Sequence, residues 1–170
     1  MRVIAASLAA ALCVAGCGDG SGRTSAGVYQ LRSGDLPEVQ VNMLDAVNFM
    51  RSNAGLGPVQ IDARLTAAAQ AQADDMSRQQ RAWGFASDGS NPYTRVSRSG
   101  YGGRLVTELY AQSFESELQT LTEWMKDEAW SSSILNPAVT DMGLAFHQDR
   151  NGMLWWVLTL GTSDPAARLR

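Results

Sequence analysis

The sequence predicts an α+β fold, a three-layer α–β–α sandwich with a mostly antiparallel sheet. Three observations predict it: two segments of helical period open the domain, an alternating segment and another helix follow, and an apolar hairpin closes it. The hairpin strands are apolar on both faces, which is typical of a sheet covered by helices on each side. Helices, strand, helix and hairpin in this order favour the layered architecture.

The first two helices are predicted from their ends and their periodicity. The first runs from about Asp35 to Asn53, because Pro37 and Glu38 suit a first helical turn. The second follows Asp62, a good N-cap residue, and ends before Gly84. The expected buried face of the first helix is Val41, Leu44, Val47 and Met50, and that of the second is Leu65, Ala69, Ala73 and Met76.

The remaining elements are predicted in the same way. A short helix starts at Asn91-Pro92 and reaches Ser97, and a strand covers residues 104–111, with Glu108 on the face of Val106 and Tyr110. A helix runs from Ser113, as its N-cap, to about Ala129. Its expected apolar face is Phe114, Leu118, Leu121 and Met125. Strands at residues 142–148 and 153–161 flank a turn whose Asn-Gly pair tolerates positive φ.

The N-terminus predicts export. Arg2 precedes an apolar run that is too short to span a bilayer, a pattern typical of a secretory signal. Val14-Ala15-Gly16-Cys17 resembles a bacterial lipobox, which implies cleavage before Cys17 and acylation of that cysteine. We therefore expect a signal peptide at 1–16, a lipid-anchored flexible tether at 17–36, a domain at 37–162 and a tail at 163–170. This predicts a cell-envelope protein with the membrane as a partner; in a Gram-negative source, the Gly18 that follows favours the outer membrane.

Composition excludes some functions. Cys13 would leave with the signal and Cys17 would carry lipid, so the mature domain would have no thiol for a disulfide or a thiolate zinc site. Removing Arg2 from the 14 basic residues leaves 13 against 17 acidic ones, a formal balance of −4. An acidic domain without a basic run predicts no nucleic-acid partner.

Several motifs, in order along the chain, resemble the CAP superfamily of cysteine-rich secretory proteins, antigen 5 and pathogenesis-related proteins. They begin with the opening segment at 48–76 and continue with Ser87-Asp88-Gly89-Ser90, followed by Arg95 and Gly100-Tyr101. They end with a glutamate, a tryptophan and a Trp-rich final strand. The matching positions are Glu108, Trp124, residues 134–137, residues 140–143 and residues 153–161. The resemblance covers roughly residues 40–161 and implies the family's α–β–α sandwich.

The resemblance also implies where a site would lie. The family's cleft typically has two histidines and acidic residues, which bind a divalent metal in some members. In this sequence Gly84 and Trp130 stand at the histidine positions, and only Glu108, expected to be exposed, remains. One carboxylate cannot supply the ligands of a transition-metal site, so we expect no metal and no cofactor.

Three catalytic alternatives stay open: a serine hydrolase, a glycosidase and an envelope hydrolase with a non-standard site. His147, the only histidine, is interpreted as a surface residue near a turn, although Asp141 and Asp149 are near it in sequence. A serine hydrolase would combine His147 and one of these aspartates with a serine from residues 131–133, but a Gly-x-Ser-x-Gly elbow is missing. A glycosidase would pair Glu108 with Glu123 or Glu128. The last alternative is an envelope hydrolase with a non-standard site around Glu108 or His147.

A non-catalytic binding role fits the sequence better. A cleft without its histidines would be lined by aromatic side chains and Glu108, and a tryptophan in place of a histidine makes it more apolar. The expected lining is Trp83, Phe85, Tyr110, Trp130 and Glu108, with Arg95 ordering the loop at 83–101. The tryptophans could also simply fill the space of a lost site. The expected ligand is an envelope lipid, glycan or protein.

Overall fold

A computed structural model describes residues 29–113 and 115–163. The expected signal peptide, Cys17, most of the tether, Phe114 and most of the C-terminal tail lie outside the described residues. Within the described ranges, no helix combines the length and the apolar character needed to cross a membrane.

A four-stranded sheet forms the middle layer, in the order β1-β3-β4-β2. β3 (Asp141–Gln148) and β4 (Leu154–Thr162) form the predicted hairpin, and β4 also pairs antiparallel with β2 (Arg104–Ser113). β1 (Gln60–Ile61) pairs parallel with β3 and was not predicted, because two residues are too short to show a period. The turn contains Gly152 at φ 91°, as Asn151-Gly152 predicted.

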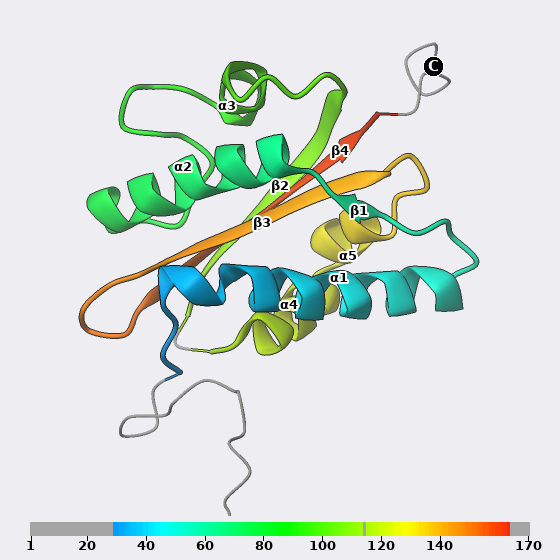
Figure 1. Ribbon diagram of the computed structural model, residues 1–170, viewed down its shortest axis with the longest axis horizontal. Coiled ribbons are helices and arrows are strands. Elements are labelled where there is room, and N and C mark those ends of the chain that lie inside the picture. The colour runs from blue at the N-terminus through cyan, green and yellow to red at the C-terminus, as the bar shows by residue number, and fades with distance from the viewer. Residues whose placement is uncertain (1–28, 114, 164–170) are drawn as a thin grey trace, which may run out of the picture.

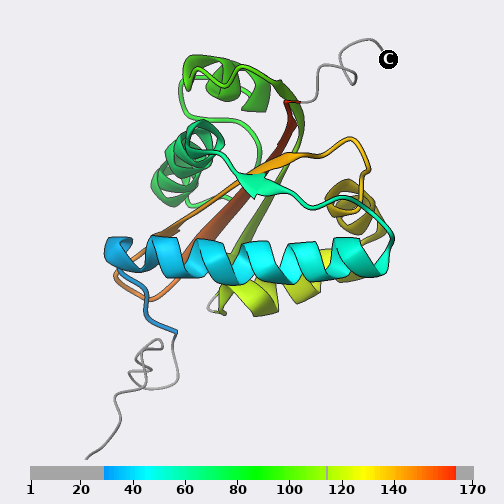
Figure 2. The same ribbon diagram turned by 45° about the vertical axis from the view of Figure 1, so that its right-hand side comes forward.

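Helices cover both faces of the sheet, so the three-layer prediction is confirmed (Figure 1). A short 3₁₀ turn (Ser33–Asp35) leads into α1 (Leu36–Asn53), which lies with α4 (Glu117–Lys126) and α5 (Glu128–Ile134) on one face. α2 (Ala63–Gln79) and α3 (Pro92–Arg98) lie on the other face (Figure 2). β4 is buried along its whole length, as expected for a central strand covered on both sides.

The predicted buried face is right for α2 and partly right for α1, where Val47 is buried, Leu44 and Met50 are partly buried against the core, and Val41 is exposed. Leu65, Ala69, Ala73 and Met76 are all fully buried, and the alanines let α2 lie close to β3 and β4. On α1 the buried line is Val39, Met43, Val47 and Arg51, each four residues from the last, whereas Val41 is 52% exposed. The error arose because α1 has apolar residues on more than one side, so its sequence did not single out the covered side.

The helix predicted from Ser113 to Ala129 is two helices. β2 continues to Ser113, and α4 begins only after Ser116, which forms a capping box with Gln119. Asp127 then adopts an extended conformation and caps α5, accepting hydrogen bonds from the amides of residues 129 and 130. Of the expected apolar face, Leu121 is buried, whereas Leu118 is 44% exposed.

Arg51 joins distant parts of the chain. Its side chain is 1% exposed and donates hydrogen bonds to four backbone carbonyls, at distances of 2.8 to 3.0 Å. The acceptors are Gly57, Ile134, Asn136 and Val139. Burial lowers the pKa of this guanidinium from its ordinary value. The residue ties the C-terminal end of α1 to the connection between α5 and β3.

Candidate functional site

The carboxylate carried over from the family is buried in an ion pair. Arg95 Nη2 on α3 lies 2.5 Å from Glu108 Oε1 on β2, and their side chains are 4% and 1% exposed. Thr159 Oγ1 donates to the other carboxylate oxygen at 3.4 Å. Burial raises the pKa of Glu108, and the charge of Arg95 offsets part of that rise. The expectation of an exposed Glu108 is therefore wrong.

A β-bulge explains the orientation of Glu108. The pairing of β2 with β4 shifts register between Leu105 and Thr107. Val106 consequently packs in the core on the α1 side, while Tyr110 packs on the α2 side and Glu108 reaches α3. The prediction that Val106 shares a face with Glu108 and Tyr110 assumed a regular strand and is wrong.

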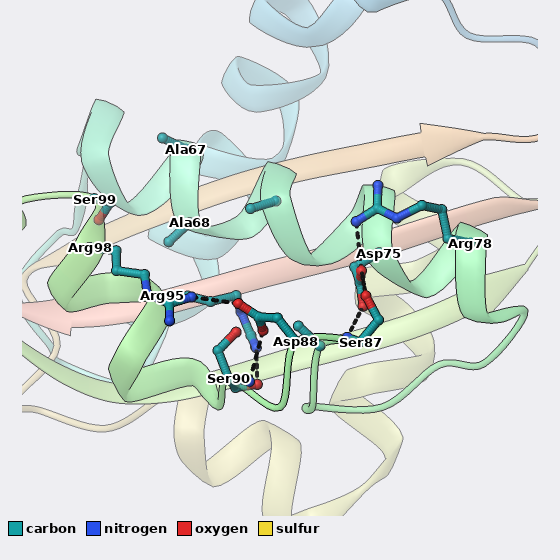
Figure 3. Close-up of a pocket in the computed structure, with 12 residues that line it drawn as sticks. Ala67, Ala68, Asp75, Arg78, Ser87, Asp88, Ser90, Arg95, Arg98 and Ser99 are labelled. Carbon is teal, nitrogen blue, oxygen red and sulfur yellow. Dashed lines mark hydrogen bonds and ion pairs between the residues drawn. The ribbon is translucent and has the colours of Figure 1, made fainter.

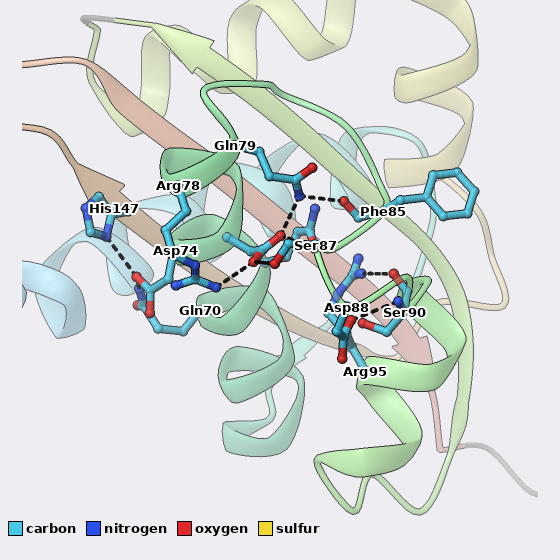
Figure 4. Close-up of polar contacts among 12 residues, drawn as sticks. Gln70, Asp74, Arg78, Gln79, Phe85, Ser87, Asp88, Ser90, Arg95 and His147 are labelled. Carbon is cyan, nitrogen blue, oxygen red and sulfur yellow. Dashed lines mark hydrogen bonds and ion pairs between the residues drawn. The ribbon is translucent and has the colours of Figure 1, made fainter.

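Arg95 orders the loop before α3, as expected from the sequence. Its Nη1 donates to Ser90 O at 3.1 Å (Figure 4), and its Nη2 also donates to Gly84 O at 3.0 Å. The Nε atom is buried and has no hydrogen-bond partner among the described residues. One guanidinium therefore holds both Glu108 and two carbonyls of the loop.

Asp75 on α2 fixes the same loop from the other side. It accepts hydrogen bonds from the amide and the hydroxyl of Ser87, both at 2.6 Å, and from Arg78 and Gln79. Gln79 also donates to Phe85 O at 3.0 Å (Figure 4). Burial acts to raise the pKa of Asp75, but these hydrogen bonds outweigh it and the pKa lies below its usual value. Sequence reasoning missed Asp75, because an acid in a helix is expected on the solvated face.

The four predicted aromatic residues gather at the β2 edge of the sheet, and we call them the aromatic cluster: Trp83, Phe85, Tyr110 and Trp130. The rings of Trp83 and Phe85 lie 5.5 Å apart, and those of Tyr110 and Trp130 also lie 5.5 Å apart, edge to face. Gly84, which separates Trp83 from Phe85 in the sequence, lies beside the second pair. A Cβ atom added to this glycine would be 3.6 Å from the Tyr110 ring. Phe85 is 52% exposed, and the Arg81 guanidinium lies 3.9 Å from the centre of the Trp83 ring.

The two positions at which the resemblance predicts histidines, Gly84 and Trp130, lie at this cluster. Gly84 packs against Tyr110, Trp130 contacts the same ring, and Glu108 is held by Arg95. Among residues 29–113 and 115–163, no group of three or more His, Cys, Asp or Glu side chains is placed to hold a metal ion.

His147 lies between two carboxylates at the hairpin end of β3. Its Nδ1 is 2.9 Å from Asp74 Oδ1 (Figure 4), and its Nε2 is 3.6 Å from Asp149 Oδ1. Because they face opposite ring nitrogens, the two acids are poorly placed to share one metal ion with the imidazole. Asp149 also accepts hydrogen bonds from Ser77, Gln80 and Trp155. The group ties α2 to the hairpin turn.

The other proposed catalytic residues are not brought together. Asp141 begins β3, at the opposite end from His147, and accepts hydrogen bonds from Tyr101, Gln60 and Thr140. Serines 131–133 lie within α5, where their hydroxyls donate to backbone carbonyls of the same helix. Glu123 and Glu128 are exposed on α4 and α5, across the sheet from the Arg95–Glu108 pair.

A pocket of about 400 Å³ lies between α2 and α3 (Figure 3), and none of its lining residues belongs to the aromatic cluster. Its apolar lining is Ala67, Ala68, Ala71 and Ala86. Two ion pairs also border it: Arg78–Asp75 at 2.6 Å and Arg98–Asp88 at 2.7 Å. We call this the alanine pocket. It was not predicted, because it forms between segments that are separate in the sequence.

The fold, the loop and the positions around Glu108 define a domain of the cysteine-rich secretory type. Residues 44–160 match the model of the CAP, or cysteine-rich secretory protein, family. Since this match covers more than half of the chain, the protein belongs to that family.

Individual relatives are distant. The uncharacterized protein YkwD of Bacillus subtilis is 25% identical over 113 residues, which are 66% of this chain and 43% of that protein. An extracellular protein with an SCP domain from Bacillus anthracis superposes with a TM-score of 0.69 at 17% identity, over 79% of this chain and 47% of the other. An outer surface protein of Borrelia burgdorferi gives a TM-score of 0.65 at 14% identity, over 76% of this chain and 96% of the other. The chain thus spans less than half the length of its relative YkwD.

Proposed function

We propose that the protein is a lipid-anchored cell-envelope protein whose CAP domain is a non-catalytic binding module. In this proposal Cys17 carries the lipid, and the aromatic cluster binds an envelope lipid, glycan or protein. The observation that carries the proposal is the cluster itself, four aromatic side chains at one sheet edge with Phe85 52% exposed. Exposed aromatic groups with a polar rim are typical of binding surfaces. The extracellular and outer-surface relatives agree with an envelope location.

The state of Glu108 supports binding over catalysis. A general acid or base must reach a substrate, whereas Glu108 is 1% exposed at its side chain and engaged by Arg95 and Thr159. A metal ion would have to displace that guanidinium, and the neighbouring family positions offer it Gly84 and Trp130 in place of imidazoles.

The test compares molecules that co-purify with the full chain in mild detergent, identified by native mass spectrometry. Phe85→Ala should lose most of the bound material, because it removes the most exposed ring of the cluster. Tyr93→Ala is the matched control, since Tyr93 is an exposed aromatic residue on α3 (66%) outside the cluster. Equal recovery from Phe85→Ala and wild type would contradict the proposal.

A further inference from the structure

The alanine pocket is separate from the aromatic cluster, so a ligand bound in it would be independent of the proposed function. Its volume of about 400 Å³ falls within the range of small-molecule sites, roughly 300–1,000 Å³. The side chains of Ala67, Ala68, Ala71 and Ala86 are short, so the space beside α2 suits a ligand with small apolar groups.

The pocket border presents charges of both signs. The side chains of Arg78 and Arg98 are 64% and 61% exposed, and the Asp88 side chain is 53% exposed. The Arg98–Asp88 pair is exposed on both sides, so a ligand can exchange its partners at small cost, whereas the Asp75 side chain of the other pair is only 4% exposed. A molecule with both an ammonium and a carboxylate matches this border, whereas a dianion would meet Asp75 and Asp88.

Arg95 is a buried part of the pocket wall. It lines the pocket, its side chain is 4% exposed, and its Nη atoms are committed to Ser90, Gly84 and Glu108. Its Nε–H has no partner among the described residues. Leaving a buried donor unpaired is costly, but this Nε atom exposes less than 1 Å² of surface, so Arg95 forms part of the inner wall of the pocket and does not present this donor to a ligand.

We propose that the alanine pocket binds a short zwitterionic peptide with small side chains, of the size of alanyl-alanine. The carboxylate is bound by an exposed guanidinium group at the border, that of Arg78 or of Arg98. The ammonium is bound by Asp88, the more exposed of the two carboxylates. The methyl groups lie against the alanines of α2.

The test is calorimetric titration of the full chain in detergent with alanyl-alanine, N-acetyl-alanyl-alanine and alanyl-alanine amide. The free dipeptide should bind saturably, and each blocked form should bind at least about ten-fold more weakly, because each loses one charge-assisted contact. Asp88→Asn should bring the free and N-acetylated dipeptides to similar affinity. A purely structural role of Asp88 would not remove that discrimination.

Two further variants locate the site. Ala71→Leu fills the pocket without changing a charge and keeps a good helix former, so it should abolish binding while the circular dichroism spectrum stays unchanged. Phe85→Ala should bind as wild type does. Absence of saturable binding, wild-type affinity in Ala71→Leu, equal affinity for all three peptides, or loss of binding in Phe85→Ala would each overturn the proposal.

Discussion

Separating Arg95 from Glu108 should destabilise the domain strongly. Both side chains are at most 4% exposed, and the two atoms lie 2.5 Å apart. Removing one partner of such a pair leaves the other charge buried and uncompensated, which costs about 3–5 kcal/mol. Arg95→Met should cost more than Glu108→Gln, because it also removes the hydrogen bonds to Ser90 and Gly84.

The measurement is urea unfolding followed by circular dichroism. With a slope of about 2 kcal/mol per molar urea, a loss of 3–5 kcal/mol lowers the midpoint by roughly 1.5–2.5 M. The double variant Arg95→Met/Glu108→Leu should cost less than the sum of its single variants, since both charges are then absent. Arg98→Met, which breaks the exposed pair with Asp88, serves as the control and should leave the urea midpoint nearly unchanged. A cost below about 1 kcal/mol for Arg95→Met, or additive single variants, would refute this reasoning.

Three other predictions concern packing, pH and the anchor. Gly143→Ala should lower the melting temperature markedly, because its Cβ would lie 2.2 Å from the backbone of Leu65, whereas Gly57→Ala meets open space and should not. Burial acts to raise the pKa of Asp141, but its hydrogen bonds outweigh it and the pKa lies below 3.8. Its stabilising effect is therefore full above pH 3.8 and is lost as the pH falls through the folded-state pKa, so Asp141→Asn should flatten the acid limb of a stability–pH curve. Labelled palmitate should enter the wild type and not Cys17→Ala, and equal labelling would contradict the anchor.

The sequence predicted the elements whose two ends and whose packing face it marks locally. α2 has an Asp62 cap and a run of alanines, and the β3–β4 hairpin has its Asn-Gly turn, so both were predicted close to their observed bounds. The helix from Ser113 failed because Asp127 ends one helix and caps the next. A capping residue inside a continuous helical pattern gives no sign that the axis changes there.

The sequence named candidate residues for the site but did not predict the contacts that they make. The family resemblance predicted one site for the aromatic residues, and the structure places Trp83 beside Phe85 and Tyr110 beside Trp130. The burial of Glu108 depends on a bulge in β2 that only the pairing with β4 reveals. Asp75 and the alanine pocket depend on how the loop folds back on α2, which no local pattern records.

Arg51 has a consequence for the environments in which the domain can stay folded. Its hydrogen bond to Val139 connects residues 88 positions apart, the kind of long loop that exported domains often close with a disulfide. No cysteine follows Cys17 in the sequence, and a guanidinium group takes no part in thiol–disulfide chemistry. This closure is therefore insensitive to thiols and oxidants. A reducing agent should therefore leave the unfolding curve of the domain unchanged.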